Sequence, residues 1–331
     1  MTTTMQALRV EQAGADFTTV ELPRPEPAAG EVRVRIHASG VNPLDTKIRA
    51  GQAAHARQPL PAVLGIDMAG VVDAVGQGVT AFKPGDEVYG MAGGVGGHPG
   101  TLAGFVATDA LLLAHKPAGL TMREAAALPL AVITAWEGLV DRANVRPGQT
   151  VLVQGGAGGV GHIAVQLARA RGARVFATAS AGDFDLIQSW GATPIDFRSQ
   201  TVAAYVGEHT AGQGFDVVFD AVGGAVLDAS FTAARRHGGH VVSILGWGTH
   251  SLAPLSFRAA TYSGVFTLWP LLSGEGREHH GHILREAAAL VDAGLIRPRL
   301  DERRFTLATA GEAHERVAGG RGQGKVVVDI A

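Results

Sequence analysis

The segment that decides the fold is Thr150-Val-Leu-Val-Gln154, which runs directly into Gly155-Gly-Ala-Gly-Gly-Val-Gly161. The first five residues form a short apolar run, which predicts a buried strand. Three of the glycines, Gly156, Gly158 and Gly161, have the spacing Gly-x-Gly-x-x-Gly, and a helix-like segment follows them. This order of strand, glycine turn and helix predicts a dinucleotide-binding βαβ unit.

Each glycine has a separate physical role in such a turn. The first allows a tight turn, the second lets the backbone approach a pyrophosphate, and the third lets the helix at 159–171 pack against the strand. The N-terminus of that helix then carries the phosphate charge. A glycine-rich turn without a ligand is the alternative interpretation. The residues expected to contact the cofactor here are Gly156, Gly158, Gly159, Val160 and Gly161.

The same alternation continues downstream of the glycine turn. Strands are expected at 150–154, 174–178, 193–196, 215–220 and 240–245, and helices at 159–171, 184–190, 199–209 and 225–234. Strands that alternate with helices predict a parallel, doubly wound sheet. This part of the chain is therefore expected to be a Rossmann domain.

The segment from residue 6 to about 115 has a different character. Residues 32–36 alternate apolar and polar side chains, and short strands are also expected at 67–75 and 86–89. Thr121 and Glu124 form a capping box, which predicts the start of a helix. We expect further helices at 134–143, 281–293 and 308–317, and a final strand at 325–330 that could return to this β-rich part.

The composition excludes several classes of protein. The chain has 331 residues, 46% of them apolar, with a formal charge of −2 and no cysteine. The chain has no basic stripe of the kind that binds nucleic acid. The absence of cysteine excludes disulfides and thiolate metal sites. Neither a signal sequence nor an apolar run long enough to span a membrane is found. We expect a soluble, cytoplasmic protein.

The end of the second Rossmann strand bears on the choice of cofactor. A site specific for NADH places a carboxylate there to hold the ribose 2′-hydroxyl, but this chain has Ala179. Thr178 and Ser180 could donate hydroxyl groups to a 2′-phosphate. No Arg or Lys follows directly, whereas Asp183 and Asp185 do. NADPH is therefore expected in preference to NADH, which stays possible.

Eight motifs, taken in order, resemble the medium-chain dehydrogenase/reductase superfamily, and within it the zinc-independent branch of quinone oxidoreductases and enoyl reductases. They are Ala38-Ser-Gly-Val-Asn-Pro-Leu-Asp45, Leu64-Gly-Ile-Asp-Met-Ala-Gly-Val-Val72, Val75-Gly76, Lys83-Pro-Gly-Asp86, Leu128-Pro129, Thr134-Ala-Trp136, Gly155 to Gly161 and Gly324-Lys-Val-Val327. The resemblance implies a GroES-like catalytic domain at 1–124 and 268–331, a Rossmann domain at 125–267, and a homodimer or homotetramer.

The same resemblance bears on zinc. Zinc-dependent relatives place a cysteine where this chain has Asn42, and Gly-His-Glu where it has Gly65-Ile66-Asp67. A catalytic zinc usually needs three protein ligands from cysteine, histidine and carboxylate side chains. Ile66 cannot bind a metal and Asn42 is a poor ligand. We therefore expect no zinc.

Candidate catalytic residues lie in the loop that begins at Asn42. Relatives of the quinone oxidoreductase type carry Asn, Asp and Tyr there; Asn42 and Asp45 match, and Lys47 stands at the Tyr position. Lys47 could stabilise an oxyanion, or donate a proton if burial lowers its pKa. In the competing interpretation, Asn42 belongs to a turn, Asp45 caps the following segment, and Lys47 is a solvated surface residue.

The resemblance assigns further residues to the cofactor and the substrate. Thr134, Leu245, Gly246 and Lys325 are expected near the nicotinamide, and Trp247 and Trp269 near the substrate. The alternatives are a helix cap for Thr134, a solvated strand edge for Lys325, a core side chain for Trp247, and core or interface packing for Trp269.

The expected activity is hydride transfer from NADPH to a small quinone or an α,β-unsaturated carbonyl compound. The cofactor supplies the hydride, and the protein supplies orientation, polarisation and a proton. Two rivals stay open. One is a zinc-independent alcohol dehydrogenase or ketone reductase, and the other is a non-catalytic NADPH-binding structural or regulatory protein.

Overall fold

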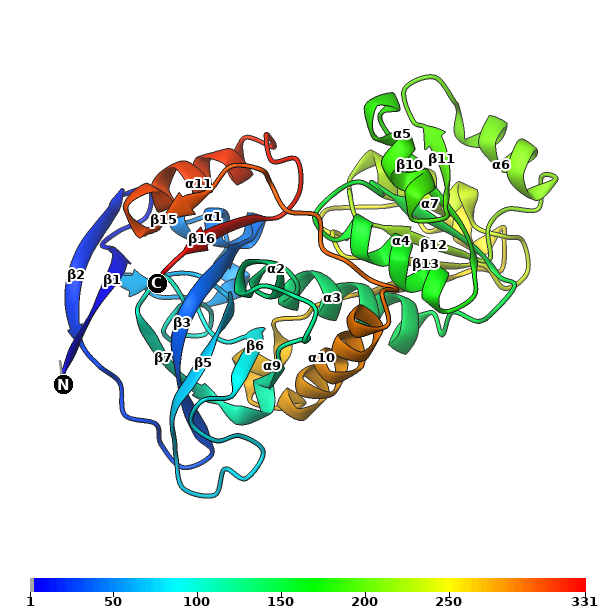
Figure 1. The fold of residues 1–331 in the computed structure, drawn as a ribbon. Helices are drawn as coiled ribbons and strands as arrows, with labels where there is room; N and C mark the ends of the chain where they lie inside the picture. The colour runs from blue at the N-terminus through cyan, green and yellow to red at the C-terminus, as the bar shows by residue number, and fades with distance from the viewer. Residues whose placement is uncertain (1–2) are drawn as a thin grey trace. The chain divides into compact units, whose positions relative to one another are not determined.

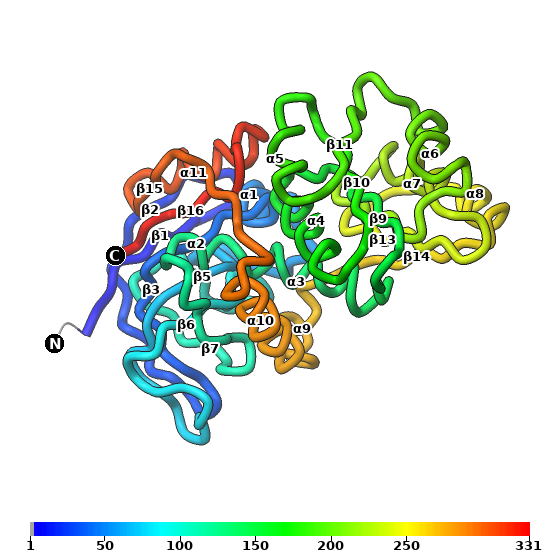
Figure 2. Tube along the Cα trace, turned by 45° about the vertical axis from the view of Figure 1, so that its right-hand side comes forward, coloured from blue at the N-terminus to red at the C-terminus, as the bar shows by residue number. Residues whose placement is uncertain are grey.

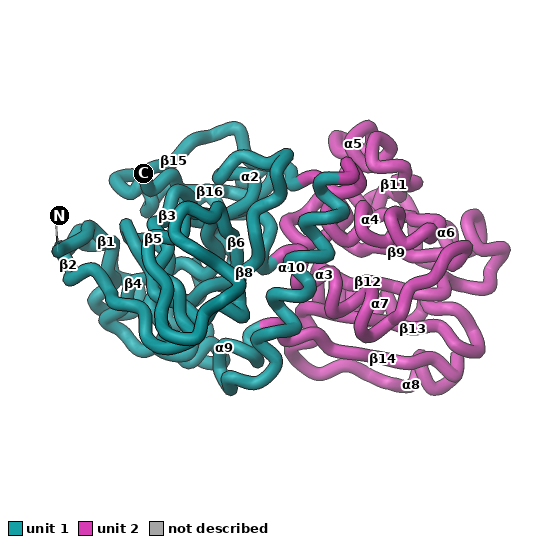
Figure 3. Tube along the Cα trace, turned by 60° about the horizontal axis from the view of Figure 1, so that its bottom comes forward, with its two compact units in different colours: residues 1–130, 268–292, 298–331 teal, residues 131–267, 293–297 magenta. Residues whose placement is uncertain are grey.

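The computed structural model describes residues 3–331, and the chain forms two compact units (Figure 3). The first unit comprises the chain up to Leu130, Leu268–Asp292 and Pro298–Ala331. The second comprises Ala131–Thr267 and Ala293–Arg297. The sequence-based limits place residues 125–130 in the other domain and do not separate the segment Ala293–Arg297.

The second unit is built on a parallel sheet with the strand order β11-β10-β9-β12-β13-β14. Its strands are β9 (Thr150–Gln154), β10 (Arg174–Ala179), β11 (Thr193–Asp196), β12 (Val217–Asp220), β13 (His240–Ser243) and β14 (Thr261–Gly264). In chain order this is 3-2-1-4-5-6, the order of a doubly wound dinucleotide-binding fold. The expected Rossmann fold is therefore confirmed. Strand β14 was missed because its sequence, Thr-Tyr-Ser-Gly, is polar.

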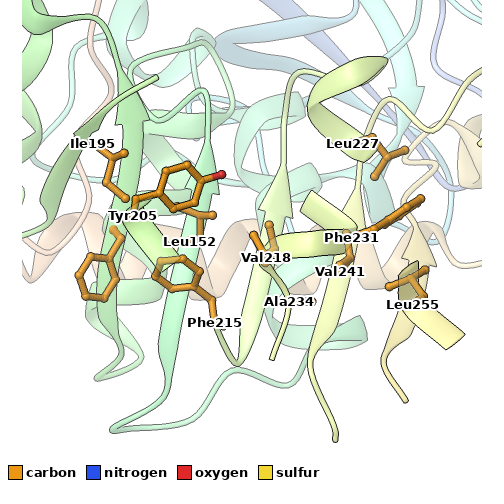
Figure 4. Packing of buried hydrophobic residues seen from close by; sticks show 12 residues of the cluster. Leu152, Ile195, Tyr205, Phe215, Val218, Leu227, Phe231, Ala234, Val241 and Leu255 are labelled. Atoms are coloured by element: carbon orange, nitrogen blue, oxygen red, sulfur yellow. The ribbon is translucent and has the colours of Figure 1, made fainter. Parts of the chain in front are cut away.

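Helices flank this sheet, and an apolar cluster packs between the sheet and some of them. The helices are α4 (Gly161–Ala170), α5 (Phe184–Ser189), α6 (Val202–Thr210), α7 (Ala225–Ala233) and α8 (Ala253–Ser256). Figure 4 shows Leu152 of β9, Val241 of β13 and Phe215, which precedes β12, in one cluster with Tyr205 of α6 and Phe231 of α7. Each of these side chains is at most 3% exposed, so the burial of this face stabilises the sheet that carries the glycine turn.

The first unit is a β-rich structure with two sheets. One has the order β2-β1-β4, and the other β15-β16-β3-β5-β6-β8 with β7 also paired to β3. The strands are β1 (Thr4–Val10), β2 (Phe17–Pro23), β3 (Glu31–Val41), β4 (Ala62–Val63), β5 (Asp67–Val75), β6 (Glu87–Met91), β7 (Phe105–Asp109), β8 (Leu113–His115), β15 (Phe305–Thr306) and β16 (Val326–Asp329). Strand β16 pairs antiparallel with β3, so the C-terminal segment returns to the β-rich unit as expected (Figures 1 and 2).

Helices connect and cover these sheets. In the first unit they are α1 (Pro43–Arg49), α2 (Met122–Ala126), α9 (Trp269–Ser273), α10 (Arg277–Asp292) and α11 (Ala310–Ala318). Thr121 caps α2 by accepting the Glu124 N–H, which confirms the predicted capping box. Helix α3 (Pro129–Trp136) continues as a π-helix at Glu137–Arg142. It begins five residues before the expected start at Thr134, because Pro129 is well suited to a first helical turn.

Residues 3–331 include no helix that is both long and apolar enough to cross a membrane.

Candidate functional site

The glycine turn after β9 is as tight as its sequence requires. A Cβ at Gly161 would lie 2.1 Å from the carbonyl oxygen of Gly155, and one at Gly156 would lie 2.6 Å from the Cβ of Ala177. Neither position can carry a larger side chain without moving backbone or core atoms. The turn therefore brings the N-terminus of α4 close to β9 and β10, as expected for a phosphate-binding turn.

The turn also lies where the order of the sheet reverses. Strands β9 and β12 are neighbours, and the chain continues from them toward opposite edges of the sheet. A Cβ at Gly155 would lie 2.8 Å from Cγ2 of Val222, so the loops that follow these two strands are in contact. Ligands of open parallel sheets bind at this switch point, beyond the carboxyl ends of the strands.

The turn offers donors for an anion. Within residues 3–331 no backbone acceptor is found for the N–H groups of Gly159, Val160 and Gly161, and both Gly158 and Gly159 are exposed. Exposed N–H groups at the start of a helix suit the pyrophosphate of a dinucleotide. The five residues from Gly156 to Gly161 that the sequence assigns to the cofactor thus lie together, and their geometry fits such a group.

Thr178 has a different role from the expected one. Its hydroxyl accepts a hydrogen bond from the Gly155 N–H (2.9 Å) and donates one to Oε1 of Gln154 (2.9 Å). The side chain is 4% exposed. The sequence predicts that Thr178 donates its hydroxyl to a 2′-phosphate. In the structure this proton is already used inside the turn, so Thr178 does not make that contact. It supports the turn instead.

Ser180 and Asp183 lie together beyond the end of β10. The Ser180 hydroxyl donates to Oδ2 of Asp183 at 3.0 Å. A carboxylate beside the expected 2′-phosphate position would repel that phosphate.

Asp220, which sequence reasoning did not single out, organises the loops at the carboxyl ends of β12 and β13. Its carboxylate accepts the Gly223 N–H (3.0 Å) and the Ser243 hydroxyl (2.7 Å) and is fully buried. A Cβ at Gly223 would lie 2.7 Å from the oxygen of Leu245, so these two loops are also packed together. The available signal was a lone acid at the end of an apolar strand, immediately before Ala-Val-Gly-Gly.

The other residues of the second unit that the sequence assigns to the cofactor or the substrate are buried to different extents. Leu245 is half-buried and Gly246 is exposed, both just beyond β13. Trp247 is 54% exposed, so the alternative of a core tryptophan is wrong. Thr134 is buried in the middle of α3 rather than at its start, so the helix-cap alternative is wrong as well.

The first unit contains a second polar site, which is buried. Asn42 is fully buried before α1, and its N–H donates to Oδ2 of Asp45 (2.7 Å). This bond caps the first turn of α1, as one of the two interpretations of Asp45 expected. The Asn42 side-chain amide donates to Oδ2 of Asp67 (2.9 Å).

Lys325 completes this site from the other end of the chain. Its Nζ donates to Oδ1 of Asn42, and the side chain is 5% exposed. The pairing of β16 with β3 brings the two residues together. The solvated strand edge that the sequence left open for Lys325 is therefore wrong. We call Asn42, Asp45, Asp67 and Lys325 the buried polar cluster.

Asp67, which the sequence suggested only as a replacement for a zinc ligand, links this cluster to a helix. Its Oδ1 accepts the N–H of Leu130, in the first turn of α3, at 3.0 Å. Gly40 on β3 allows this strand to pack closely against α2, because a Cβ at Gly40 would lie 2.2 Å from the backbone oxygen of Ala126 in α2.

Burial controls the protonation of the cluster. Loss of solvation raises the pKa of Asp45 to about 7 and that of Asp67 to about 6. The same loss of solvation lowers the pKa of Lys325, while the charges of Asp67 and Asp45 oppose that shift. Asp45 and Asp67 therefore change charge near neutral pH, and perturbed pKa values of this kind are common at functional sites.

Lys47 does not belong to the cluster. It is exposed on α1, whereas Asp45 and Ile48 of the same helix face inward. Near this helix is a cavity of about 490 Å³, lined by Ile48, Gly51, Ala53, Ala54, Arg57, Gln58, Pro59 and Leu60. Its volume suits a small organic molecule. Trp269 does not line it, and is 51% exposed on α9.

The donor set of the cluster does not suit zinc. Ile66 is a buried hydrocarbon side chain, and both ends of the Asn42 amide are already hydrogen-bonded. Across the described part of the chain, no group of three or more His, Cys, Asp or Glu side chains could hold a metal ion.

Comparisons with known families match both units. Residues 28–118 match the alcohol dehydrogenase GroES-like domain, and residues 190–328 match the family described as zinc-binding dehydrogenase. An alcohol dehydrogenase superfamily protein from Novosphingobium aromaticivorans has a crystal structure with a TM-score of 0.97 to this chain; the two are 60% identical over 99% of this chain and 100% of the other.

Two curated relatives have names that describe either a specific reductase or a much longer synthase protein. The 2-methylene-furan-3-one reductase of Solanum lycopersicum is 34% identical over 92% of this chain and 73% of its own length. The spectinabilin polyketide synthase system protein NorB of Streptomyces orinoci is 35% identical over 97% of this chain, and this chain spans only 14% of its length. The glycine turn at the switch point, the GroES-like unit and these matches together show that the chain belongs to the medium-chain dehydrogenase/reductase superfamily of oxidoreductases.

Proposed function

We propose that the protein is a zinc-independent reductase that uses NADPH to reduce α,β-unsaturated carbonyl compounds or quinones. The single observation that carries the proposal is the buried polar cluster, which offers a cation and an amide in an oxidoreductase whose donor set does not suit zinc. The 34% identity to a 2-methylene-furan-3-one reductase supports the class of substrate.

The residues that would hold the cofactor are those of the glycine turn. The N–H groups of Gly159, Val160 and Gly161 would bind the pyrophosphate, and Ser180 would lie at the adenosine ribose. The bound nicotinamide supplies the hydride. By the resemblance, Thr134, Leu245 and Gly246 line the nicotinamide.

The preference between cofactors is expected to be modest. Ala179 offers no carboxylate to a ribose 2′-hydroxyl, which favours NADPH. Asp183 places a negative charge beside Ser180, which disfavours a 2′-phosphate. We therefore propose NADPH as the better donor and NADH as a weaker one.

The oligomeric state is also a proposal. Strand β14 is at the edge of its sheet, and Phe257 nearby is 87% exposed. An exposed edge strand with apolar neighbours favours association of chains. We propose a homodimer or homotetramer, and light scattering coupled to size-exclusion chromatography would show a monomer if this is wrong.

Consumption of NADPH with 2-cyclohexenone tests the activity. The expected product is the saturated ketone; an allylic alcohol would instead indicate a ketone reductase. A panel of enones and quinones should be followed at 340 nm with enzyme that elemental analysis shows to be free of zinc. No turnover with any of them, together with tight NADPH binding, would favour a non-catalytic role. Activity that appears only with stoichiometric zinc would contradict zinc independence.

A further inference from the structure

Lys325 is an unusual lysine because its charged end is buried. The side chain is 5% exposed, and the backbone on both sides is anchored: the Lys325 N–H donates to the oxygen of Arg299 (2.7 Å), and its own oxygen accepts the N–H of Asp301 (2.9 Å). Burial of an ammonium group is costly unless other groups compensate its charge. The position of Lys325 therefore needs a specific explanation.

The surrounding charges provide this compensation. Asn42 presents its oxygen to Lys325 and its NH₂ group to Asp67. The opposite orientation of the amide would place the NH₂ group against the ammonium and the oxygen against the carboxylate. The two charges thus hold the amide in one orientation, and the amide in turn directs the lysine.

The hydrogen bonds of Lys325 are incomplete. An ammonium group has three N–H donors, and in residues 3–331 only Asn42 accepts one of them. Oδ1 of Asp45 also has no hydrogen-bond partner among these residues. Buried donors without acceptors are rare in folded proteins. The unused N–H groups of Lys325 are therefore suited to a ligand that carries an oxygen atom.

We propose that Lys325 is a catalytic residue that binds the substrate oxygen during hydride transfer and supplies the proton, and that Asp67 is a positioning residue acting through Asn42. This assignment rests on the proposed reductase function. It places a positive charge among residues that stand where the resemblance puts zinc ligands in zinc-dependent relatives. Lys325 would therefore provide the polarisation that those relatives obtain from a metal.

Reduction of an enone at this site requires a hydride at carbon and a proton for the resulting enolate. The bound cofactor would supply a hydride for a new C–H bond at the β-carbon of the substrate, and the electron pair of the C=C bond would move toward the carbonyl, leaving an enolate oxygen. An N–H group of Lys325 donates to this oxygen. The ammonium then transfers a proton to the enolate, keeping the electron pair of the broken N–H bond, and the neutral amine regains a proton from water. Stabilisation and proton transfer of this kind each contribute about 10²-fold or more to a rate.

Substitutions test the two roles. Lys325→Met removes the charge at similar length, and Lys325→Arg restores it. We expect Lys325→Met to lower kcat with 2-cyclohexenone by about 100-fold or more, with less than a threefold change in KM and in the Kd of NADPH, and Lys325→Arg to recover part of the loss. Lys83→Met is the matched control, because Lys83 is 81% exposed. A folded Lys325→Met enzyme that retains kcat within threefold of the parent would overturn the proposal.

Asp67→Asn separates positioning from folding. Loss of this carboxylate removes the charge that stabilises the ammonium, so the basic limb of the kcat–pH profile should move to lower pH. A purely structural residue would lower Tm without moving that limb. If Lys325→Met does not fold because two carboxylates are left uncompensated, the Lys325→Met/Asp67→Asn double variant removes one of them, and the same 100-fold loss is expected.

A measurement without turnover keeps the two proposals distinguishable. The chain has four lysines, so ¹⁵N-labelled Nζ signals can be assigned with single substitutions. The Lys325 signal should titrate below 10.5, and lower still in Asp67→Asn; titration at or above 10.5 would overturn the assignment. If no enone or quinone is reduced, the proposed function fails whatever this titration shows. If substrates are reduced equally well by Lys325→Met, only the inference about Lys325 fails.

Discussion

The hydroxyl of Thr178 on β10 accepts the N–H of Gly155 at 2.9 Å, and the N–H of Gly156 donates to the backbone oxygen of Thr178 at the same distance. One residue thus holds the first two glycines of the turn against the neighbouring strand. The same hydroxyl donates to Gln154. The shape of the cofactor turn therefore depends on a side chain 23 residues beyond Gly155 in the chain.

Thr178→Val should weaken NADPH binding, because valine has a similar shape but leaves the half-buried Gly155 N–H without its hydrogen-bond acceptor. Such a loss costs about 1–3 kcal/mol, so the Kd is expected to rise about tenfold and Tm to fall. Thr178→Ser keeps the hydroxyl and should stay near the parent. Fluorescence titration of NADPH checks both variants, and an unchanged Kd and Tm in Thr178→Val would contradict the bridging role.

Substitutions in the glycine turn should separate ligand binding from folding. A Cβ at Gly158 meets only the oxygen of Gly155, at 3.2 Å, whereas a Cβ at Gly161 would be 2.1 Å from that atom. Gly158→Ala should therefore keep Tm nearly unchanged while the Kd of NADPH rises, since the methyl group occupies the approach of the pyrophosphate. Gly161→Ala should lower Tm clearly. Equal losses of Tm in the two variants would argue against this geometry.

Asp183→Asn should increase the preference for NADPH over NADH. The substitution removes a negative charge beside Ser180, where a 2′-phosphate is expected. Removal of a charge at this range should change the ratio of the two kcat/KM values by about 3- to 10-fold. Asp185→Asn, which changes the net charge equally, is the control. An equal response of both variants would show that the effect does not come from a local contact.

His314 should make stability depend on pH. Burial lowers its pKa to about 3, from 6.5 in the unfolded chain, and neither ring nitrogen has a hydrogen-bond partner within the described residues. Between these two pKa values the unfolded state binds more protons than the folded state. The contribution of the neutral His314 to stability is therefore fully present above pH 6.5 and is lost as the pH falls.

Comparison with His314→Leu isolates this contribution. The difference in unfolding free energy between parent and variant should shift by about 2 kcal/mol against the parent from pH 7 to pH 5. Urea unfolding at several pH values measures it, and the subtraction cancels the opposite contributions of Asp45 and Asp67. A difference that does not change with pH would show that the His314 ring gains a proton in the folded state.

The sequence alone determined the Rossmann unit and its cofactor turn. These features depend on local order: an apolar strand, a glycine spacing and a helix are adjacent in the chain, and the limits predicted for β9 agree with the structure. The capping box at Thr121 and Glu124 is local in the same way.

Tertiary structure alone decided the composition of the buried polar cluster and the role of Thr178. Lys325 and Asn42 are 283 residues apart and meet only because β16 pairs with β3. Lys47, which is close to Asn42 in the sequence, faces the other way on α1. Burial, and the pKa values that follow from it, depend on every element packed around a group, so no spacing within one segment could have revealed them.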